Sequence, residues 1–337
     1  MKIFTINEYS ELKSIVVGNI DYANWPTGDI YFDAMMDSST YDGKIKKGPV
    51  PNEVKKIAEE DLNLFVSKLE NEKIKVYRPE KKNWEIEYKK FDKITTGMHT
   101  YSTRDLLLSL NNKVIECPTP YISRQHEYAA FETIKREAIK DGCLWLSAPL
   151  PEINKTDFKI ENDKVILTED FPIFDAANVL KFNDKLLYLI SCTGNYAGSK
   201  WLQKMVGNEF EVITWDGVYS HAHIDSTIVS LNDNTILLNG SRVTDKNLPL
   251  FLKDKKKIWI DDLVPREFHE FPYASKWIGF NIISINPETV FVDNIQKNFI
   301  KILQDNGFKV IQTPMRHSRT LGGGFHCVTL DLERSKS

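Results

Sequence analysis

One pattern recurs four times along the chain and constrains its fold more than any other feature. An apolar run is followed by a short polar turn and then by a second apolar run, at residues 105–117, 177–191, 226–240 and 279–293. The turns begin near Asn111, Asn183, Asn232 and Asn286. Asparagine beside Asp, Lys or Pro between two apolar runs is typical of a β-hairpin. A pattern that returns at a regular interval predicts a fold built from similar units.

A third apolar run follows each hairpin, and a helical segment precedes it in most cases. The helical segments are 123–141, 198–207 and 294–307, whereas the third copy has only weak helical signal. The third runs are 144–149, 210–215, 257–262 and 308–314. In 294–307 the residues Ile295, Phe299 and Leu303 share one face, with Asp293 expected as the N-cap and Gly307 as the stop. The predicted unit is strand–strand–helix–strand.

A fifth unit can be assembled from the two ends of the chain. Residues 12–18 read as a strand, 52–72 as a helix and 73–77 as another strand. The missing strand is 327–333, so the last strand is expected to pair with the first unit and close a ring. The length alone suggests about two domains. The recurrence instead predicts one α/β domain over residues 1–337.

Charge and composition exclude several classes of protein. Forty-four basic and 47 acidic residues give a net charge of −3, which argues against a nucleic-acid backbone as main partner. No run approaches the ~18 apolar residues of a membrane-spanning helix, and the first residues do not resemble a targeting peptide, so a cytoplasmic location is expected. The four cysteines form no CxxC pair, which argues against disulfides and zinc. Residues 334–337 are expected to be a frayed tail.

Polar residues stand at the start of the hairpins, where apolar residues would be ordinary. They are Asp105, Asp175, His223, Asp225 and, before the closing strand, Cys327. If the units surround one axis, these side chains converge on one cavity. A thiolate is a nucleophile, an imidazole moves protons, and paired carboxylates fit a planar guanidinium. The glycines at 322–324 allow a tight turn and a close approach to a ligand.

These residues also have other interpretations. A single Asp at the head of a strand is usually a turn or cap residue, and Cys117, Cys143 and Cys192 are expected in the core. The set His221, His223 and Asp225 could bind a metal ion, but no second group with ligand spacing accompanies it. The glycine run lacks the GK[ST] of a phosphate loop. A protease-like Cys/His pair leaves Asp105 and Asp225 without a role.

At these residues the chain resembles the glycine and inosamine amidinotransferase family, which has the pentein fold. The resemblance runs from NEYSELKSIVVGN at residue 7 to Arg334 and includes TRDLLLSLNNKVIECP, FDAAN, HIDST, ASKW and LGGGFHC. The implied fold is a five-bladed α/β-propeller of strand–strand–helix–strand units around a central cavity. The pairing of HIDST with LGGGFHC is the most specific part of the resemblance.

The resemblance implies a ping-pong transfer of the amidino group of L-arginine to an amine, with release of L-ornithine. Cys327 would be the nucleophile, His223 the general acid and base, and Asp175 its carboxylate partner. Asp105 and Asp225 would grip the guanidinium. Arg242 would bind the arginine carboxylate, and Ser275 would contribute a hydroxyl to the substrate site. No metal or organic cofactor is implied, and the family is compatible with a homodimer.

Of three departures from the family pattern, two concern the substrate site and the third, at Asn178, concerns the bonding behind it. Ser220 and Ala222 stand where members that use glycine carry Asn and Met, which argues for a roomier acceptor site and an acceptor other than glycine, such as a natural-product intermediate. Ala274 replaces the first of two family serines, and Asn178 replaces an Asp. The alternatives are glycine as acceptor, a guanidine hydrolase of the arginine or agmatine deiminase type, and a protein that binds a guanidino ligand without chemistry.

Overall fold

Five three-stranded sheets repeat one pattern of strand pairing in this computed structural model, which describes residues 1–37 and 44–336. In each sheet two strands form an antiparallel pair, and the middle strand pairs in parallel with a third. The strands of the first two sheets in chain order are β7 (Leu107–Leu110), β8 (Lys113–Glu116) and β9 (Leu144–Ser147), then β12 (Val179–Phe182), β13 (Lys185–Leu189) and β14 (Glu211–Trp215). Those of the next two are β15 (Ile228–Ser230), β16 (Thr235–Asn239) and β17 (Lys256–Ile260), then β18 (Ile283–Asn286), β19 (Thr289–Asp293) and β20 (Lys309–Thr313). All four predicted hairpins are confirmed.

The fifth sheet joins the two ends of the chain, as predicted. It contains β21 (Thr329–Arg334), β1 (Leu12–Val17) and β4 (Lys75–Tyr77), with β1 in the middle. Leu12 lies opposite Arg334, and Val17 lies opposite Thr329. The sheets are separate from one another, and no sheet among the described residues closes on itself.

The prediction that residues 334–337 form a frayed tail is wrong for Arg334. Arg334 is the last residue of β21 and is buried. Its guanidinium donates to Asp331 at 2.7 Å and to the backbone carbonyls of Ser10 at 2.6 Å and Ser284 at 2.8 Å. A charged residue close to the chain end gives no sequence signal of such contacts, so it was read as solvated.

Two of the predicted hairpin turns show why asparagine occupies them. Asn111 has φ +49° and Asn183 has φ +57°. This left-handed region is unfavourable for most residues but is tolerated by asparagine. The polar turn therefore fixes where each strand reverses.

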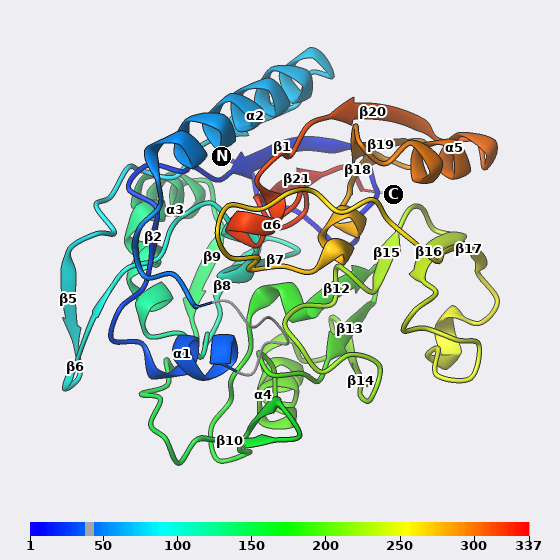
Figure 1. Cartoon of the computed structure of the whole chain (residues 1–337). Helices are drawn as coiled ribbons and strands as arrows, with labels where there is room; N and C mark the ends of the chain where they lie inside the picture. The colour runs from blue at the N-terminus through cyan, green and yellow to red at the C-terminus, as the bar shows by residue number, and fades with distance from the viewer. Residues whose placement is uncertain (38–43, 337) are drawn as a thin grey trace.

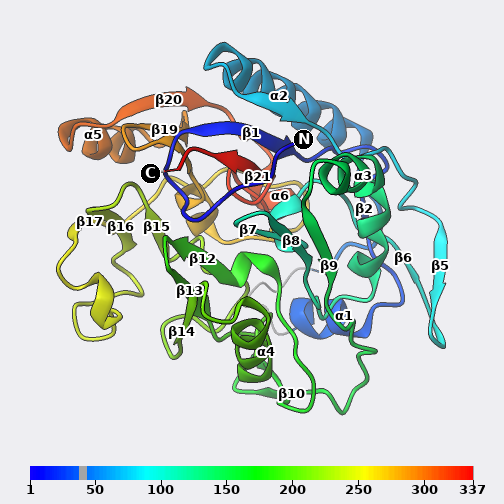
Figure 2. The ribbon, with the colours of Figure 1, turned by 180° about the vertical axis from the view of Figure 1, so that it is seen from behind.

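The longer helices lie at the outside of the molecule. In both ribbon views α2 (Asn52–Asn71), α3 (Glu132–Lys140), α4 (Tyr196–Val206) and α5 (Lys297–Asp305) are at the rim (Figures 1 and 2). The short α6 (Ser318–Leu321) and β21 are near the middle of both views. The third unit has only a 3₁₀ turn, η4 (Leu250–Leu252), as its weak helical signal indicated.

Helix α5 begins later than the sequence predicted. Its N-cap is Gln296, so the prediction of Asp293 as N-cap is wrong. The carboxylate of Asp293 is instead paired with Arg266, at 2.9 Å from its Nε. The predicted stop is confirmed, because Gly307 follows the helix with φ +92°.

Insertions within and between the units carry elements that the sequence pattern did not predict. Three two-stranded ribbons pair β2 (Asn24–Trp25) with β3 (Gly48–Pro49), β5 (Glu87–Lys90) with β6 (Lys93–Thr96), and β10 (Phe158–Glu161) with β11 (Lys164–Leu167). Helix α1 (Ile30–Asp37) lies in the same insertion as β2 and β3. The predicted helical segment 123–141 consists of a 3₁₀ segment, η2 (Ser123–Phe131), followed by α3.

Apolar packing fixes the helices on the sheets. Phe65 of α2, for example, is fully buried and meets Phe291 of β19 and Phe325 edge to face at ring-centre distances of 5.0 Å. Burying such a side chain stabilises the fold by about 1.5–3 kcal/mol. Within the described part of the chain, every helix is too short or too polar to cross a bilayer.

Candidate active site

The sequence-predicted site residues occupy equivalent places in four units. Asp105 ends the 3₁₀ turn η1 (Thr103–Asp105) just before β7, and Asp175 is the N-cap of η3 (Ala176–Asn178) just before β12. His223 and Asp225 lie in the turn before β15, and Cys327 lies two residues before β21. The prediction that the heads of the hairpins share one cavity is confirmed for Asp105, His223, Asp225 and Cys327 but is wrong for Asp175, which contacts His223 from outside the cavity wall.

A cavity of about 640 Å³ brings four of them together, namely Asp105, His223, Asp225 and Cys327. This volume is in the range of small-molecule sites. Asp175 is not part of the cavity wall; it is fully buried behind His223.

The imidazole of His223 lies between two carboxylates. Its Nε2 is 2.9 Å from Oδ2 of Asp175, and its Nδ1 is 3.5 Å from Oδ1 of Asp105. Burial acts to lower the pKa of His223, but these two carboxylates outweigh it and raise the pKa to about 9. The residue also has φ +70°, an uncommon conformation for a non-glycine residue that is often found at functional sites. The geometry thus holds a protonated imidazole at neutral pH.

The thiol of Cys327 lies beside the other carboxylate of the cavity. Its Sγ is 3.5 Å from Oδ2 of Asp225. Burial, followed by the charges of Asp225 and Asp105, raises the pKa of Cys327 well above that of an ordinary thiol. Without a ligand the thiol is therefore protonated at neutral pH.

A second histidine, which the sequence reasoning missed, holds that carboxylate. Nδ1 of His326 is 2.8 Å from Oδ2 of Asp225. Burial acts to raise the pKa of Asp225, but the hydrogen bond and charge of His326, aided by His223, keep it below its ordinary value. The position next to the predicted nucleophile was the available signal, because His326 directly precedes Cys327.

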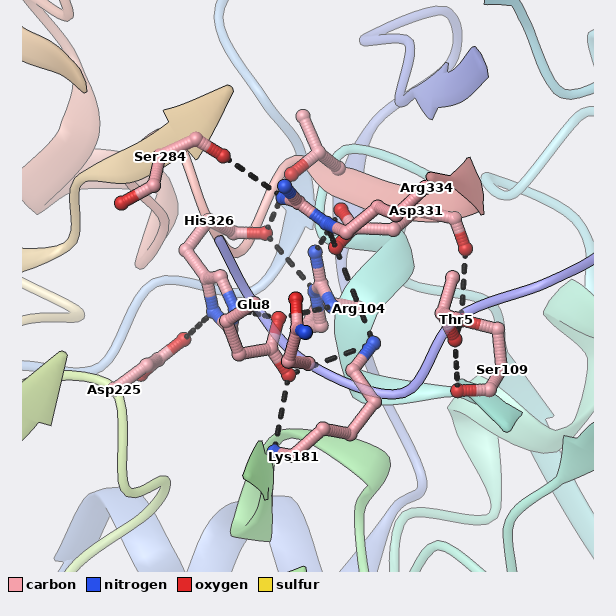
Figure 3. Close-up of polar contacts among 12 residues, drawn as sticks. Thr5, Glu8, Arg104, Ser109, Lys181, Asp225, Ser284, His326, Asp331 and Arg334 are labelled. Carbon is pink, nitrogen blue, oxygen red and sulfur yellow. Dashed lines mark hydrogen bonds and ion pairs between the residues drawn. The ribbon is translucent and has the colours of Figure 1, made fainter. Parts of the chain in front are cut away.

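Behind His326 lies a buried cluster of charges (Figure 3). Nε2 of His326 is 3.5 Å from Oε2 of Glu8, and Glu8 is 3.4 Å from Nζ of Lys181 and 3.6 Å from Arg104. Asp331 accepts from Arg104 at 2.8 Å and from Arg334 at 2.7 Å. The cluster connects the N-terminal segment, η1, β12 and β21, and it links the site to the pairing of the chain ends.

Arg124 is another charged residue of the site that the sequence reasoning missed. It forms an ion pair with Oδ2 of Asp105, donates to Glu127 at 3.0 Å and donates to the carbonyl of Ser102 at 2.8 Å. Burial raises the pKa of Asp105 although His223 and Arg124 act in the opposite direction. Arg124 lies in η2, within a segment read from sequence only as helical, so nothing there marked it as functional.

Asn281 is the polar residue at the head of the hairpin in the remaining unit, that of β18, β19 and β20. It follows η5 (Lys276–Phe280) and precedes β18. Its Oδ1 accepts the backbone N–H of Cys327 at 2.9 Å, and its side chain also lowers the pKa of Asp225. The fourth hairpin head reads Gly-Phe-Asn, and a neutral amide at this place gives no sequence signal of a role in catalysis.

The predicted substrate-binding residues are placed less uniformly. Ala222 and Ser275 line the cavity, and Oγ of Ser275 caps η5 through the N–H of Trp277. Ser220 is not in the cavity wall; its carbonyl accepts from Cys192 at 3.0 Å. Arg242 is not in the cavity wall either. Its guanidinium lies 3.5 Å from the ring centre of Tyr219, and Tyr219 is part of the cavity wall.

Asn178 has a structural position. It donates to the carbonyl of Leu189 at 2.9 Å and to Ser191 at 2.8 Å, and it accepts from Thr193 at 2.8 Å. The carbonyl of Thr193 in turn accepts the N–H of Asp175. Asn178 therefore supports the loop that holds Asp175.

The three glycines before Cys327 differ in what they do. Gly322 lines the cavity with φ +73°. A Cβ on Gly323 would lie 2.9 Å from Oγ of Ser102, and one on Gly324 would lie 2.8 Å from Cβ of Asn281. The close approach at Gly323 and Gly324 is therefore to other parts of the protein, whereas the prediction assigned it to a ligand.

The remaining cysteines pack among apolar side chains, as predicted. Cys117, Cys143 and Cys192 belong to three different buried clusters, and burial raises the pKa of each. No group of three or more His, Cys, Asp or Glu side chains within residues 1–37 and 44–336 has a geometry that could hold a metal ion.

Curated proteins similar in sequence are amidinotransferases. The chain is 38% identical to inosamine-phosphate amidinotransferase 1 of Streptomyces griseus, over 98% of this chain and 96% of that protein. It is 29% identical to L-arginine:L-lysine amidinotransferase of Pseudomonas savastanoi pv. phaseolicola, over 98% and 94%. Mitochondrial glycine amidinotransferase of Xenopus tropicalis is 28% identical, over 98% of this chain and 83% of that protein. No family model matches the sequence.

Solved structures agree with this result. Inosamine-phosphate amidinotransferase of Streptomyces griseus superimposes with a TM-score of 0.95 at 37% identity, covering 99% of this chain and 97% of that one. The N-terminal domain of a cyanobacterial arginine dihydrolase superimposes with a TM-score of 0.65 at 15% identity, covering 96% and 98%. The second likeness concerns the fold alone, an α/β pentein fold.

Proposed function

Since the chain belongs to the amidinotransferase family and is an enzyme that transfers amidino groups, we propose that it takes the amidino group from L-arginine onto Cys327. The enzyme then passes the group to an amine and releases L-ornithine. The observation that carries this proposal is the cavity shared by Cys327, His223, Asp105 and Asp225.

Binding of the donor would activate the nucleophile. The guanidinium of arginine is a planar cation that matches carboxylates, and Asp105 and Asp225 are the carboxylates of the cavity wall. The charges of these two residues contribute to the raised pKa of Cys327. A cation between them offsets that effect, so the thiol releases its proton to solvent when arginine is bound.

The first half of the reaction forms a bond from sulfur to carbon. The thiolate of Cys327 attacks the guanidinium carbon, and the bond from this carbon to the ornithine nitrogen breaks. The imidazolium of His223 donates its proton to that nitrogen and becomes neutral. Ornithine leaves, and a cationic amidino group remains on sulfur.

The second half reverses these roles. The amine acceptor attacks the same carbon, neutral His223 takes a proton from the attacking nitrogen, and the carbon–sulfur bond breaks. The products are the amidinated acceptor, the Cys327 thiolate and protonated His223, so the enzyme is ready for another cycle. Splitting one displacement into two is the advantage of covalent catalysis.

The acceptor is an amine other than glycine in this proposal. The relatives are named for inosamine phosphate, lysine and glycine, so membership of the family does not select one acceptor. Ala222 gives the cavity wall a small side chain. In this proposal the guanidinium of Arg242, which lies beside Tyr219 at the cavity, binds the carboxylate of arginine. The hydroxyl of Ser275 forms a hydrogen bond with the substrate.

The five sheets are, in this proposal, the blades of a five-bladed propeller that forms one domain over residues 1–337. The support is the identical pairing order in all five and the inclusion of β21 in the sheet of β1. The heads of all five hairpins then face one axis, which accounts for the equivalent positions of the site residues.

The test combines product analysis with detection of the adduct. The protein is mixed with L-arginine alone, and intact-mass spectrometry is expected to find one amidino group on the wild type and none on Cys327→Ala. Addition of hydroxylamine or another amine is expected to increase ornithine release. Formation of citrulline and ammonia without an acceptor would show a hydrolase instead. Activity of Cys327→Ala equal to wild type would overturn the covalent route.

A further inference from the structure

One part of the cavity wall is apolar. It is made by Phe32, Met35 and Met36 of α1, together with Met98 and Tyr273, all members of one contact cluster, here called the apolar wall. Ala222 packs against the same cluster. Because Ala222 is in the loop expected to face the acceptor, the apolar wall is adjacent to the acceptor side.

His99 adds one polar group beside the apolar wall. It lines the cavity next to Met98, is only 1% exposed, and neither ring nitrogen makes a hydrogen bond of normal geometry within the described residues. Burial and the charge of Arg124 lower the pKa of His99 to about 3, although the Leu321 carbonyl favours its protonated form. A neutral imidazole offers one donor and one acceptor. The donor faces the Leu321 carbonyl, which leaves the acceptor nitrogen for a hydroxyl of a ligand.

The cationic side chains of the cavity wall are already engaged by the protein. Arg124 is bound by Asp105, Glu127 and a carbonyl. Lys276 is paired with Asp262. Arg319 donates to the carbonyls of Ala274 and Arg266. An anionic group placed against the apolar wall would therefore lose water without gaining a counter-charge, which is costly.

Arg242, assigned above to the donor carboxylate, loses that partner when ornithine leaves, so it can pair with an acceptor anion only away from the apolar wall. It contacts Tyr219, Ser226 and Thr227, none of which belongs to the apolar wall. An acceptor whose far end packs on the apolar wall therefore places that end away from Arg242.

Resting on the proposed function, we infer that the acceptor is a primary amine with no anionic group. Its apolar chain or ring packs on the apolar wall, and one hydroxyl-type group bonds to the imidazole of His99. This distinguishes the acceptor from amino acids and from phosphorylated amines.

The test compares three acceptors of equal chain length with the wild-type protein and L-arginine. The probes are 6-amino-1-hexanol, n-hexylamine and 6-aminohexanoate, which end in a hydroxyl, a methyl and a carboxylate. We expect kcat/KM to decrease in that order, with the carboxylate at least about tenfold below the hydroxyl. A preference for 6-aminohexanoate, or no reaction of either neutral amine, overturns the inference.

Two variants test the residues that carry the inference. His99→Leu should remove the advantage of the hydroxyl over the methyl, and Met98→Lys should raise the kcat/KM ratio of 6-aminohexanoate to n-hexylamine by about tenfold or more. Leu250→Lys introduces the same charge at a site 81% exposed and outside the cavity wall, and should leave both ratios unchanged. Unaltered ratios in both cavity variants contradict the inference.

Exchange of labelled ornithine into arginine is measured on the wild type without an acceptor. This measurement distinguishes a failure of the proposed arginine half-reaction from a failure of the acceptor assignment. If exchange is absent, the proposed arginine half-reaction fails. If exchange occurs but the carboxylate is the preferred acceptor, only the assignment of the apolar wall and His99 fails.

Discussion

His326 and Asp225 are joined by a hydrogen bond of 2.8 Å, and the accepting oxygen of Asp225 is also the one that lies 3.5 Å from the sulfur of Cys327. The far side of His326 faces Glu8 at 3.5 Å, within the buried charge cluster. The orientation of a carboxylate in the cavity therefore depends on a residue that lies outside the cavity wall. We regard His326 as a positioning residue.

Replacing His326 by Gln should impair this arrangement without removing a group that touches substrate. The charge that keeps the pKa of Asp225 low would be lost. We expect the acidic limb of the kcat/KM profile for arginine to move to higher pH and kcat/KM at neutral pH to fall by about tenfold or more. His317→Gln, at a half-buried histidine outside the charge cluster, is the matched control. An unchanged acidic limb in His326→Gln would show that its role is structural only.

Asp175→Asn should reveal the link between His223 and stability. The pKa of His223 is raised from its ordinary value near 6.5 to about 9 in the folded protein. The stabilisation from its proton is therefore complete below about pH 6.5 and is lost as the pH rises through about 9. The variant should be less stable than wild type at low pH by about 1.4 kcal/mol for each unit that the pKa of His223 falls.

Urea unfolding at a series of pH values measures this difference. The deficit of Asp175→Asn should shrink between pH 6.5 and 9, whereas Asp184→Asn, at an exposed carboxylate, should show little deficit at any pH. A deficit in Asp175→Asn that is independent of pH would refute the link to His223.

Asp225→Asn should make Cys327 more reactive and the enzyme less active. Burial still raises the pKa of the thiol, but the next contribution, the charge of Asp225, is removed. We expect faster alkylation of Cys327 by iodoacetamide at neutral pH, by about tenfold for each unit that the thiol pKa falls, together with loss of transfer from arginine. Peptide mass spectrometry locates the alkylated cysteine. Slower alkylation than in wild type would contradict the assigned effect of Asp225.

Arg334→Gln should destabilise the protein strongly although Arg334 lies three residues from the end of the sequence. The variant leaves buried Asp331 without one of its cations and two carbonyls without a donor. Breaking a buried ion pair from one side costs about 3–5 kcal/mol. Arg136→Gln, in an exposed pair with Glu132, should cost less than about 1 kcal/mol. Thermal unfolding of both variants checks this, and equal losses would contradict it.

The sequence predicted the repeated unit well because the unit is specified locally. Asn111 and Asn183 adopt the left-handed turn conformation that favours asparagine, and the apolar runs on either side become paired strands. The pairing of β21 with β1 could be predicted only by elimination, since one unit lacked a strand. The ribbons in the insertions follow no repeated pattern, so they gave no comparable signal.

Residues of the candidate site could be recognised in the sequence where a reactive or ionisable side chain stands beside an apolar run, as at Cys327 and Asp175. They could not be recognised where the side chain is neutral, as at Asn281, or where a charge lies in the interior, as at Lys181. Lys181 interrupts an apolar strand all of whose residues are buried. Its counter-charges, Glu8 and Asp331, are 173 and 150 positions away in the chain, and no local pattern connects them.

The pairing of β21 with β1 has a kinetic consequence. Ser10 and Arg334 are 324 residues apart and meet only in the folded protein. Bringing together positions so distant costs about 5 kcal/mol of chain entropy before any contact repays it. Contacts of this separation are expected to form slowly. Cys327 lies two residues before β21, so during refolding the recovery of enzymatic activity should lag behind the recovery of helical structure.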